Sequence, residues 1–510
     1  MKPNVLLLAL VASLTPAASS QAPYGTGTPG TGSVTPSLTC GRAWMGNPAF
    51  SLNVAYGLGG AAAWVGISFA QSTSIFNGAN LLIDLTPAQL FLVQPLSLSG
   101  PVGSAGAGSA TLPYPITLPP TPSLAGLTLY AQVGIDEGNG LWAASKGLAI
   151  TLAMPPRIVV GTSVGGNTDP FYVIDPTGSQ PSMHTQFNGP GGVSGMNDNC
   201  TDAEFAHDGR RIYVGQVFGN AIQELNLENS PPTWSPLYAA AGPAYGIGVD
   251  HANDLTYTLA GAVSSRELTA VDSALGSPTY GQALTATSGL ASLGYVERWE
   301  LSPDGKRAAV LTLSRQLIIV DTDLAGTNYM GFASVGMIPV NQAIFALATG
   351  CEFTPDGLQI LITIQTGGGG VGEVARFDVL LAQWIDHNPI QPGIQNIGSQ
   401  SNPPAAVPAA PWEIEVAATG TFAVVSGWAG AGSLARIDLD PLNPFAWSFT
   451  RFTSPVSLAG EAWCSAISSD DTMIATCGSG QLLIFDAWFG TLLGQIPLPG
   501  VANVRAVTWE

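Results

Sequence analysis

The amino-acid sequence predicts an all-β fold, and three observations support that prediction. Only 10% of the 510 residues are charged, whereas 62 are glycine and 39 are proline, a composition typical of short strands joined by turns. A Pro-Asp-Gly turn between two strands recurs along the chain, and so does an apolar strand that ends in Asp. Repeats of short strands at a period of roughly 40–50 residues are typical of a β-propeller. The sequence therefore predicts a seven-bladed β-propeller preceded by a small antiparallel β-sandwich.

Residues 1–20 have the pattern of a secretory signal peptide. Lys2 supplies a positive charge, residues 5–14 are apolar, and small residues follow up to the expected cleavage near Ser20. The apolar run is too short for a transmembrane helix, and no later run is long enough. The first cysteine, Cys40, lies too far along the chain for a lipoprotein signal. We therefore expect an exported protein (periplasmic, cell-surface or extracellular) without a transmembrane segment.

Two segments separate the signal peptide from the repeats. Residues 21–37 alternate Gly, Thr and Pro, which is typical of a flexible linker or an extended arm. Residues 38–154 contain five apolar segments that we interpret as strands, with Gly- and Pro-rich gaps between them. Strands of this kind and number predict the small antiparallel β-sandwich.

The repeat defines a second domain, residues 156–510. Its clearest turns are Ser302–Gly305 and Thr354–Gly357, in which Pro and Asp begin the turn and Gly takes backbone angles that other residues avoid. Seven strand ends follow at intervals of 46 to 60 residues: Asp175, Asn226, Asp272, Asp321, Asp378, Asp438 and Asp486. Seven such ends predict seven blades.

The segments SPDGKRAAVL, TPDGLQILIT and AHDGRRIYVG, each followed by an apolar run, resemble the YVTN-type, lactonase-like seven-bladed β-propellers. The resemblance spans residues 156–510 and rests on turn glycines and strand ends. It therefore implies the fold, which many functions share, and not a particular chemistry. The lactonase-like enzymes place acidic, basic and cationic groups at the channel. None of those groups matches a residue of this chain one by one, so the resemblance implies no catalytic residue.

Charge and histidine content limit the expected partners. The net charge is −19 without a basic cluster, so nucleic acid and anionic membranes are poor partners. The chain has only four histidines. Of these, His207 and His251 lie at equivalent turns of neighbouring blades, where two imidazoles could share a metal. Exposed turn residues are the simpler interpretation, and we expect no metal, no other cofactor and a monomer.

The propeller geometry predicts where a site would form. The inner strand of each blade begins at one mouth of the central channel, so residues six or seven before the turn Asp should gather there. The predicted ligand-binding residues are Asp202, Tyr245, Glu297, Arg298, Trp412, Glu413 and Trp463. Arg298 shares its register with Asp202 and Glu413, and an arginine between carboxylates can hold a planar anionic or amide group. Trp412 and Trp463 would add apolar walls for sugar rings or peptide side chains.

Three functions are compatible with this sequence. We favour a non-catalytic binding or envelope protein that holds a protein, a polysaccharide or a small polar ligand at the channel mouth. The alternative is a lactonase-like hydrolase that uses Glu297, Arg298 and Glu413. The paucity of histidine disfavours a third function, a quinone-cofactor or metal oxidoreductase. The missing catalytic set favours binding over catalysis and leaves the enzymatic alternative open.

Ring closure is a further expectation. Residues 158–161 match the second strand of the next blade, so the first blade lacks its own inner strand. The apolar, β-prone residues 504–508 are otherwise unassigned and would supply it. Such pairing would remove two exposed sheet edges.

A disulfide between Cys464 and Cys477 is also expected. In the last blade a turn between Asp470 and Asp471 would place these cysteines opposite each other on antiparallel strands, within disulfide range. Export would supply an oxidising compartment. Two buried thiols are the alternative.

Overall fold

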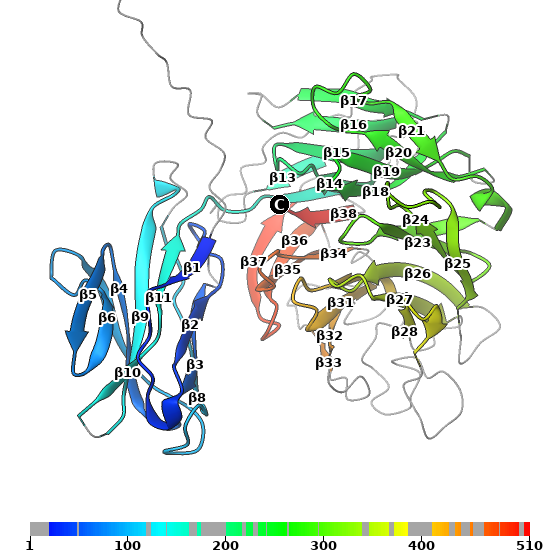
Figure 1. Ribbon diagram of the computed structural model, residues 1–510. Helices are drawn as coiled ribbons and strands as arrows, with labels where there is room; N and C mark the ends of the chain where they lie inside the picture. The colour runs from blue at the N-terminus through cyan, green and yellow to red at the C-terminus, as the bar shows by residue number, and fades with distance from the viewer. Residues whose placement is uncertain are drawn as a thin grey trace, which may run out of the picture. The chain divides into compact units, whose positions relative to one another are not determined.

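The computed structural model divides the chain into two compact units, Met1–Pro156 (unit 1) and Arg157–Glu510 (unit 2), and each is described by itself. The structure describes residues 20–510 except 48–49, 119–123, 139, 163–170, 175–199, 217–220, 228–232, 241, 263–264, 294, 339–345, 367–371, 386–410, 428–433, 440–448, 452–463, 479 and 499–503. In these residues almost all regular structure is β-strand, as the composition predicts (Figure 1). None of the described helices is long and apolar enough to cross a membrane.

Unit 1 contains two main antiparallel sheets and a hairpin. The larger sheet has the order β1 (Ser20–Tyr24), β11 (Gly147–Thr151), β9 (Thr128–Asp136), β4 (Ala62–Ser68) and β7 (Leu90–Ser97), with β10 (Trp142–Ala144) paired to β9. The second sheet has the order β2 (Ser37–Cys40), β3 (Ser51–Gly57) and β8 (Gly108–Pro113), and β5 (Gln71–Phe76) pairs with β6 (Ala79–Ile83). Buried side chains of both sheets, such as Leu52, Val65 and Val133, form one core.

The segment 21–37, expected as a flexible linker or an extended arm, is partly built into unit 1 as an extended strand. Residues 20–24 form the edge strand β1 and pair antiparallel with β11. The Tyr24 ring packs edge-on against Tyr130, with 5.6 Å between ring centroids. It also lies over Gly147 so closely that a Cβ at this position would clash with the ring. A Gly- and Pro-rich composition indicates extended backbone but not a pairing partner, so the sequence did not predict this strand.

Unit 2 contains seven small antiparallel sheets in its described residues. The strand orders are β13 (Phe171–Ile174)-β12 (Ile158–Thr162)-β38 (Val504–Trp509); β14 (Cys200–Phe205)-β15 (Arg211–Gln216)-β16 (Ala221–Asn226)-β17 (Thr233–Ala239); β18 (Ala244–Asp250)-β19 (Leu255–Ala260)-β20 (Glu267–Asp272)-β21 (Ala283–Ala286); β22 (Val296–Leu301)-β23 (Arg307–Thr312)-β24 (Gln316–Asp321)-β25 (Phe332–Met337); β26 (Ala346–Phe353)-β27 (Gln359–Thr366)-β28 (Glu373–Asp378)-β29 (Gln383–Trp384); β30 (Pro411–Val416)-β31 (Phe422–Gly427)-β32 (Leu434–Asp438)-β33 (Phe449–Arg451); and β34 (Ser465–Ile467)-β35 (Met473–Gly478)-β36 (Gln481–Asp486)-β37 (Leu492–Pro497).

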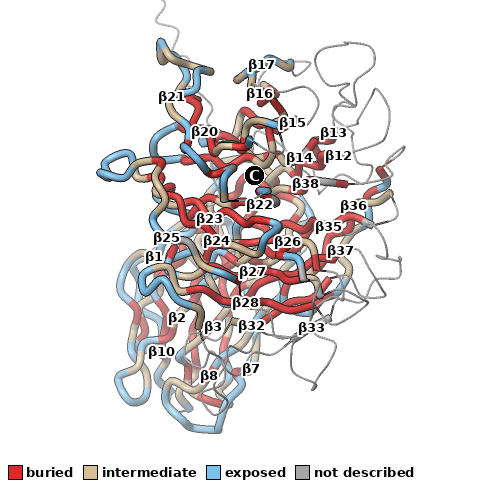
Figure 2. Tube along the Cα trace, turned by 90° about the vertical axis from the view of Figure 1, so that its right-hand side faces the viewer, coloured by how far each residue is buried: buried red, intermediate tan, exposed pale blue. Residues whose placement is uncertain are grey.

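The innermost strands of these sheets contact one another in a closed cycle. The cycle runs β38, β14, β18, β22, β26, β30, β34 and back to β38. Middle strands such as β23, β27 and β35 are buried over most of their length (Figure 2), because neighbouring sheets cover both of their faces. Small four-stranded sheets around a central axis are the arrangement of a propeller-like fold.

The repeated turns have the structure that their residues predict. Gly305 has φ of 69° and its amide donates to the carbonyl of Ser302 at 2.8 Å, which closes the turn between β22 and β23. The Ser302 hydroxyl donates to Asp304 at 2.7 Å and accepts from the amide of Arg307 at 2.9 Å. Gly209, Gly357 and Gly420 also have positive φ at the equivalent turns. Each turn fixes the register of the strand that follows it.

The predicted ring closure is confirmed. Strand β38 pairs antiparallel with β12, with Ile158 opposite Trp509 and Gly161 opposite Ala506. Beyond the ladder, the guanidinium of Arg157 contacts the carboxylate of Glu510 at 2.7 Å. The indole of Trp509 donates to the carbonyl of Ala466 at 3.1 Å, which links β38 to the last sheet.

The expected disulfide between Cys464 and Cys477 is not present. Both residues are buried thiols, although the register of the hairpin is the predicted one, with Ile467 opposite Ile474. The paired ladder stops at Ser465 opposite Thr476, so Cys464 lies one residue outside it. There the hydroxyl of Thr476 donates to the carbonyl of Cys464 at 2.8 Å, a contact with the backbone in place of a covalent bond between the side chains.

Deleting residues 502–510 is expected to destabilise unit 2 by at least about 3 kcal/mol, because β12 loses its partner strand and its edge becomes exposed. Urea unfolding followed by circular dichroism measures the change. The control is Glu510→Gln, which removes the ion pair to Arg157 but keeps the strand and should cost at most about 1 kcal/mol. A truncated protein that unfolds at the wild-type urea concentration would contradict a closed ring.

Candidate functional site

Strands β14, β22, β26 and β30, four of the innermost strands of unit 2, each have a β-bulge near their first residues. The register shifts directly before Asp202, Arg298, Gly350 and Glu413, which start the regular part of β14, β22, β26 and β30. A bulge re-aims the side chains that follow it. We call these four residues the mouth layer. Because side chains two apart on a strand point the same way, a second layer follows two residues further along each strand.

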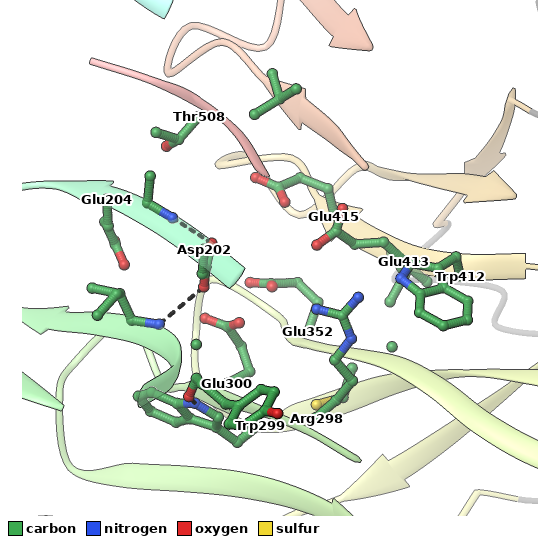
Figure 3. A pocket seen from close by; sticks show the side chains of 18 of the residues that line it. Asp202, Glu204, Arg298, Trp299, Glu300, Glu352, Trp412, Glu413, Glu415 and Thr508 are labelled. Atoms are coloured by element: carbon green, nitrogen blue, oxygen red, sulfur yellow. Dashed lines mark hydrogen bonds between the residues drawn. The ribbon is translucent and has the colours of Figure 1, made fainter. Parts of the chain in front are cut away.

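The second layer consists entirely of glutamates. Its members are Glu204, Glu300, Glu352 and Glu415, and we call them the glutamate ring. The mouth layer and the glutamate ring line one cavity of about 560 Å³. Side chains from four separate sheets point into this cavity (Figure 3), with the ring carboxyl groups gathered beside Asp202 and with Arg298 extended toward Glu413 and Trp412.

Five of the seven predicted binding residues line this cavity: Asp202, Tyr245, Arg298, Trp412 and Glu413. The backbone of Glu297 lies in β22, next to Arg298, and its side chain is not described. Trp463 lies outside the described residues. Sequence reasoning missed the glutamate ring. The missed signal was a Glu two residues after each mouth position, in strands that are otherwise largely apolar.

The mouth carboxylates connect neighbouring sheets. Asp202 in β14 accepts the amide of Ala203 at 2.9 Å and the amide of Ile247, in the next sheet, at 3.0 Å. Glu413 in β30 accepts the amide of Ser465, again in the next sheet, at 3.2 Å. Burial raises the pKa of Asp202, and it raises the pKa of Glu413 to about 7, although the nearby Arg298 opposes both shifts. Glu413 therefore titrates near neutral pH.

Arg298 is the cation of the mouth layer. Its guanidinium lies 5.4 Å from the ring centroid of Trp412, in cation–π range. Within the described residues it forms no ion pair within 4.0 Å and no hydrogen bond, although Asp202 and Glu413 lie near enough to feel its charge. The predicted arginine between carboxylates is thus present, but its five N–H donors are not used by those carboxylates.

A second arginine of the cavity wall is held by two contacts, although its Nε has no hydrogen-bond partner. Arg266 donates to the carbonyl of Val296 at 2.6 Å, and its guanidinium lies 3.6 Å from the ring centroid of Tyr245. Tyr245 is held in turn by Trp299, whose indole donates to the Tyr245 carbonyl at 2.9 Å. The next residue, Gly246, has φ of 68°, and a Cβ there would collide with the Trp299 ring. These contacts fix the aromatic wall opposite the carboxylates.

The glutamate ring is an unusual electrostatic environment. Burial raises the pKa of Glu204 to about 8, with a further increase from Asp202. The pKa values of Glu300, Glu352 and Glu415 lie well above the ordinary range, first because of burial and then because of neighbouring carboxylates. Each side chain is only partly exposed, because the cavity reaches it from one side while protein surrounds the others. At neutral pH the ring therefore holds protons that free glutamates would have lost.

The two turn histidines do lie together. The rings of His207 and His251 are 5.8 Å apart between centroids, beside a second cavity of about 420 Å³ that also contacts Glu204 and Glu510. Burial, with a contribution from His207, lowers the pKa of His251. Across the parts of the chain that the structure describes, no three His, Cys, Asp or Glu residues are grouped to hold a metal. The pair is thus a contact between turns of adjacent sheets.

Comparisons with known proteins show similarity in fold alone. No protein-family profile and no curated protein matches the chain. The structure is similar to a proposed 6-phosphogluconolactonase from Bacteroides uniformis, with a TM-score of 0.50, 12% identity, and 70% of this chain and 99% of the other covered. For a proposed 6-phosphogluconolactonase from Bacteroides fragilis, the TM-score is 0.49 and the identity 12%, with 70% of this chain and 98% of the other covered. For the β-propeller domain of Cps50 (Swd1) from Myceliophteria thermophila, the TM-score is 0.43 and the identity 14%, with 59% of this chain and 87% of the other covered.

The raised pKa values predict that unit 2 loses stability as pH rises. The glutamates of the unfolded chain release their protons near their ordinary pKa of about 4.5, whereas the folded ring keeps them to higher pH. The stability that these protons contribute is therefore complete below about pH 4.5. It is lost as the pH rises through about 8, the pKa of Glu204. Glu352→Gln removes one ionisable group without changing shape. We expect it to raise the free energy of unfolding at pH 8 by at least about 1 kcal/mol, since one pKa unit corresponds to about 1.4 kcal/mol.

Thermal and urea unfolding between about pH 5 and 8 measure this effect. The matched control is Asp356→Asn, an exposed turn residue of the same sheet that can keep its turn hydrogen bonds as an amide. Its stability should follow that of the wild type at every pH. If Glu352→Gln is no more stable than the wild type at pH 8, the pKa of Glu352 is not raised in the folded protein.

Proposed function

We propose that unit 2 is a seven-bladed β-propeller of the YVTN-type, lactonase-like kind and that it binds a small polar ligand in the cavity at Arg298 and Glu413. The observation that carries the proposal is the guanidinium of Arg298, which lies in a lined cavity and, among the described residues, forms no ion pair and no hydrogen bond. An arginine at such a position can present a pair of parallel N–H donors to a carboxylate, a carbonyl or another planar acceptor. The cavity volume suits a ligand of the size of a monosaccharide or a short peptide.

The walls of the cavity support the same interpretation. Trp412 offers an apolar face beside the guanidinium, and Tyr245 adds a second aromatic wall. Ser465, whose amide already binds Glu413, also lines the cavity. A few polar groups set among aromatic walls are typical of small-molecule sites.

For the whole chain we propose an exported protein. Residues 1–20 would be a cleaved signal peptide, and the two sheets of unit 1 that share one core would form an antiparallel β-sandwich. We infer a periplasmic, cell-surface or extracellular location and a monomeric protein. These inferences rest on the sequence pattern of the N-terminus and on the acidic composition.

One observation favours a second candidate function, lactone hydrolysis. The pKa of Glu413, raised to about 7 by burial, suits a general base that activates water at neutral pH. Arg298 lies near enough to influence that pKa and could stabilise the oxyanion that forms when water attacks a lactone carbonyl. Protonated carboxyl groups of the ring would have to supply the acid for the leaving oxygen. No residue of this chain matches the catalytic set of the lactonase-like enzymes one by one, so binding without chemistry is our main proposal.

A thermal-shift screen of sugars, lactones and short peptides tests the proposal. We expect a ligand that raises the Tm of the wild type, and we expect Arg298→Ala to abolish most of that rise because the acceptor loses both donors. Arg298→Lys should recover only part of it, since a single ammonium cannot bind in bidentate fashion. Arg307→Ala, a change in the neighbouring strand β23, is the control that should keep the full shift.

The same lactones, followed by pH-stat, separate the two candidate functions. Hydrolysis that disappears in Glu413→Gln would establish the enzyme. Binding without hydrolysis supports a binding protein. A ligand that stabilises wild type and Arg298→Ala equally would place its site outside this cavity and overturn the proposal.

A further inference from the structure

We propose that the ligand carries an ammonium group that enters the glutamate ring while an anionic or carbonyl group of the same molecule contacts Arg298. The ligand class is therefore a small zwitterion with separated charges, such as an ω-amino acid or a short peptide. This inference rests on the proposed function, because it assumes that Arg298 contacts the ligand. It adds the identity of the opposite end of the ligand.

The charges of the cavity wall are the first argument. Six carboxyl groups line the cavity, those of the glutamate ring together with Asp202 and Glu413, against the two guanidinium groups of Arg266 and Arg298. Arg266 is already bound by a backbone carbonyl and covered by Tyr245, so it neutralises the ring poorly. A cationic ligand group would balance the charge of ring carboxylates that ionise on binding. An anion alone would gain nothing from the protonated ring and would be repelled by the ionised one.

An unused polar atom points to a ligand independently of the charges. Ser465 lines the cavity, the residue is only 2% exposed, and its buried hydroxyl has no hydrogen-bond partner. A buried hydroxyl without a partner costs about 1–3 kcal/mol, so a bound ligand that accepts from or donates to it would recover that energy. Ser465 adjoins Glu413 through its amide, which places this atom in the mouth layer, near Arg298.

The two layers set the spacing of the ligand charges. Arg298 and Glu300 are two residues apart on β22, as are Glu413 and Glu415 on β30, and two residues of a strand span roughly 6–7 Å. A ligand that bridges the mouth layer and the ring therefore separates its anionic and cationic groups by about that distance. An ω-amino acid of four to six carbons has such a separation, whereas glycine is too short.

An extended organic cation fits the ring better than a metal ion. Within the described residues no three acidic groups lie close enough together to coordinate one ion. The carboxylates come from four different sheets and surround a cavity that is much larger than a single ion. An ammonium group can donate three hydrogen bonds to groups on several sides.

Proton release is the signature of this binding mode. The other titratable and charged groups that line the same cavity are Asp202, Glu413, Arg298, Arg266, Tyr245, Cys200 and Cys351. The ring holds protons in the empty cavity because burial and mutual repulsion raise the pKa values. An ammonium group favours the ionised carboxylates, so its binding must expel protons and must strengthen as pH rises from about 6 to 8.

Isothermal titration calorimetry with three matched probes tests the inference. The probes are 5-aminopentanoate, pentylamine and pentanoate, which carry both charged groups, only the ammonium and only the carboxylate. We expect 5-aminopentanoate to bind the wild type most tightly, pentanoate at least tenfold more weakly, and glycine more weakly than the five-carbon probe. The apparent enthalpy should depend on the ionisation enthalpy of the buffer, because protons are released.

Variants of the ring give the decisive result. Glu300→Gln and Glu352→Gln should each weaken 5-aminopentanoate binding at least tenfold and reduce proton release, although Glu352→Gln stabilises the folded protein. A gain in stability combined with a loss of binding is not expected of residues that only support the fold. Asp356→Asn is the control that should leave binding unchanged.

The outcomes separate this inference from the proposed function. If pentanoate binds as tightly as 5-aminopentanoate and binding requires Arg298, the proposed function stands and the ammonium site is overturned. Calcium binding that requires Glu300 and Glu352 and excludes 5-aminopentanoate would also overturn it. If no probe binds, and no ligand from the wider screen depends on Arg298, both proposals fail together.

Discussion

The backbone ladder between β12 and β38 is the interaction on which the rest of unit 2 depends. It joins the first residues of the unit to the last, so that β38 completes the cycle of contacting innermost strands. Strand β38 also brings Val507 and Thr508 to the wall of the central cavity. Closure of the cycle and formation of the cavity wall therefore depend on the same residues, which pair with β12 and also line the cavity.

A closed cycle of strands also brings polar side chains from different sheets together around one axis. Each innermost strand is covered by neighbouring sheets, and side chains that point along the axis meet those of other strands. Apolar residues of these strands pack in clusters, such as Trp299 and Leu301 in one cluster and Ile414 in another. The acidic residues that alternate with them point into the channel instead. Acidic residues recurring at one position therefore form a ring, even though they are far apart in sequence.

The fold was largely predictable from sequence because its information is local. A turn of the type Ser302–Gly305 and the apolar run after it determine a hairpin by themselves, and seven such runs imply a closed array of sheets. The closing strand was predictable because residues 158–161 resemble a second strand that lacks an inner neighbour. The pairing of β1 was not predictable, since a Gly- and Pro-rich segment carries no pattern that selects β11 as partner.

The site was predictable only in part, for a similar reason. Positions counted back from the turn Asp identified the mouth layer, because the turns fix the register of each strand. The bulges that re-aim Asp202, Arg298 and Glu413 leave no mark in the sequence that we recognised. The glutamate ring was visible as single acidic residues, but their meeting depends on four sheets. The expectation of a disulfide was wrong as well. The ladder that would have placed Cys464 opposite Cys477 ends one residue earlier, at Ser465.

The stability cost of the glutamate ring bears on whether the channel is a site or only a filled core. Apolar side chains would fill the axis without any charge to desolvate, whereas four carboxyl groups with raised pKa values destabilise the fold as pH rises. Backbone hydrogen bonds to Glu204, Glu300 and Glu415 lower their pKa values, but burial outweighs them. Arg298 belongs to the mouth layer, and among the described residues it forms no ion pair with the ring. A ligand cation would convert this cost into binding energy, because the ring is already assembled and desolvated before the ligand arrives.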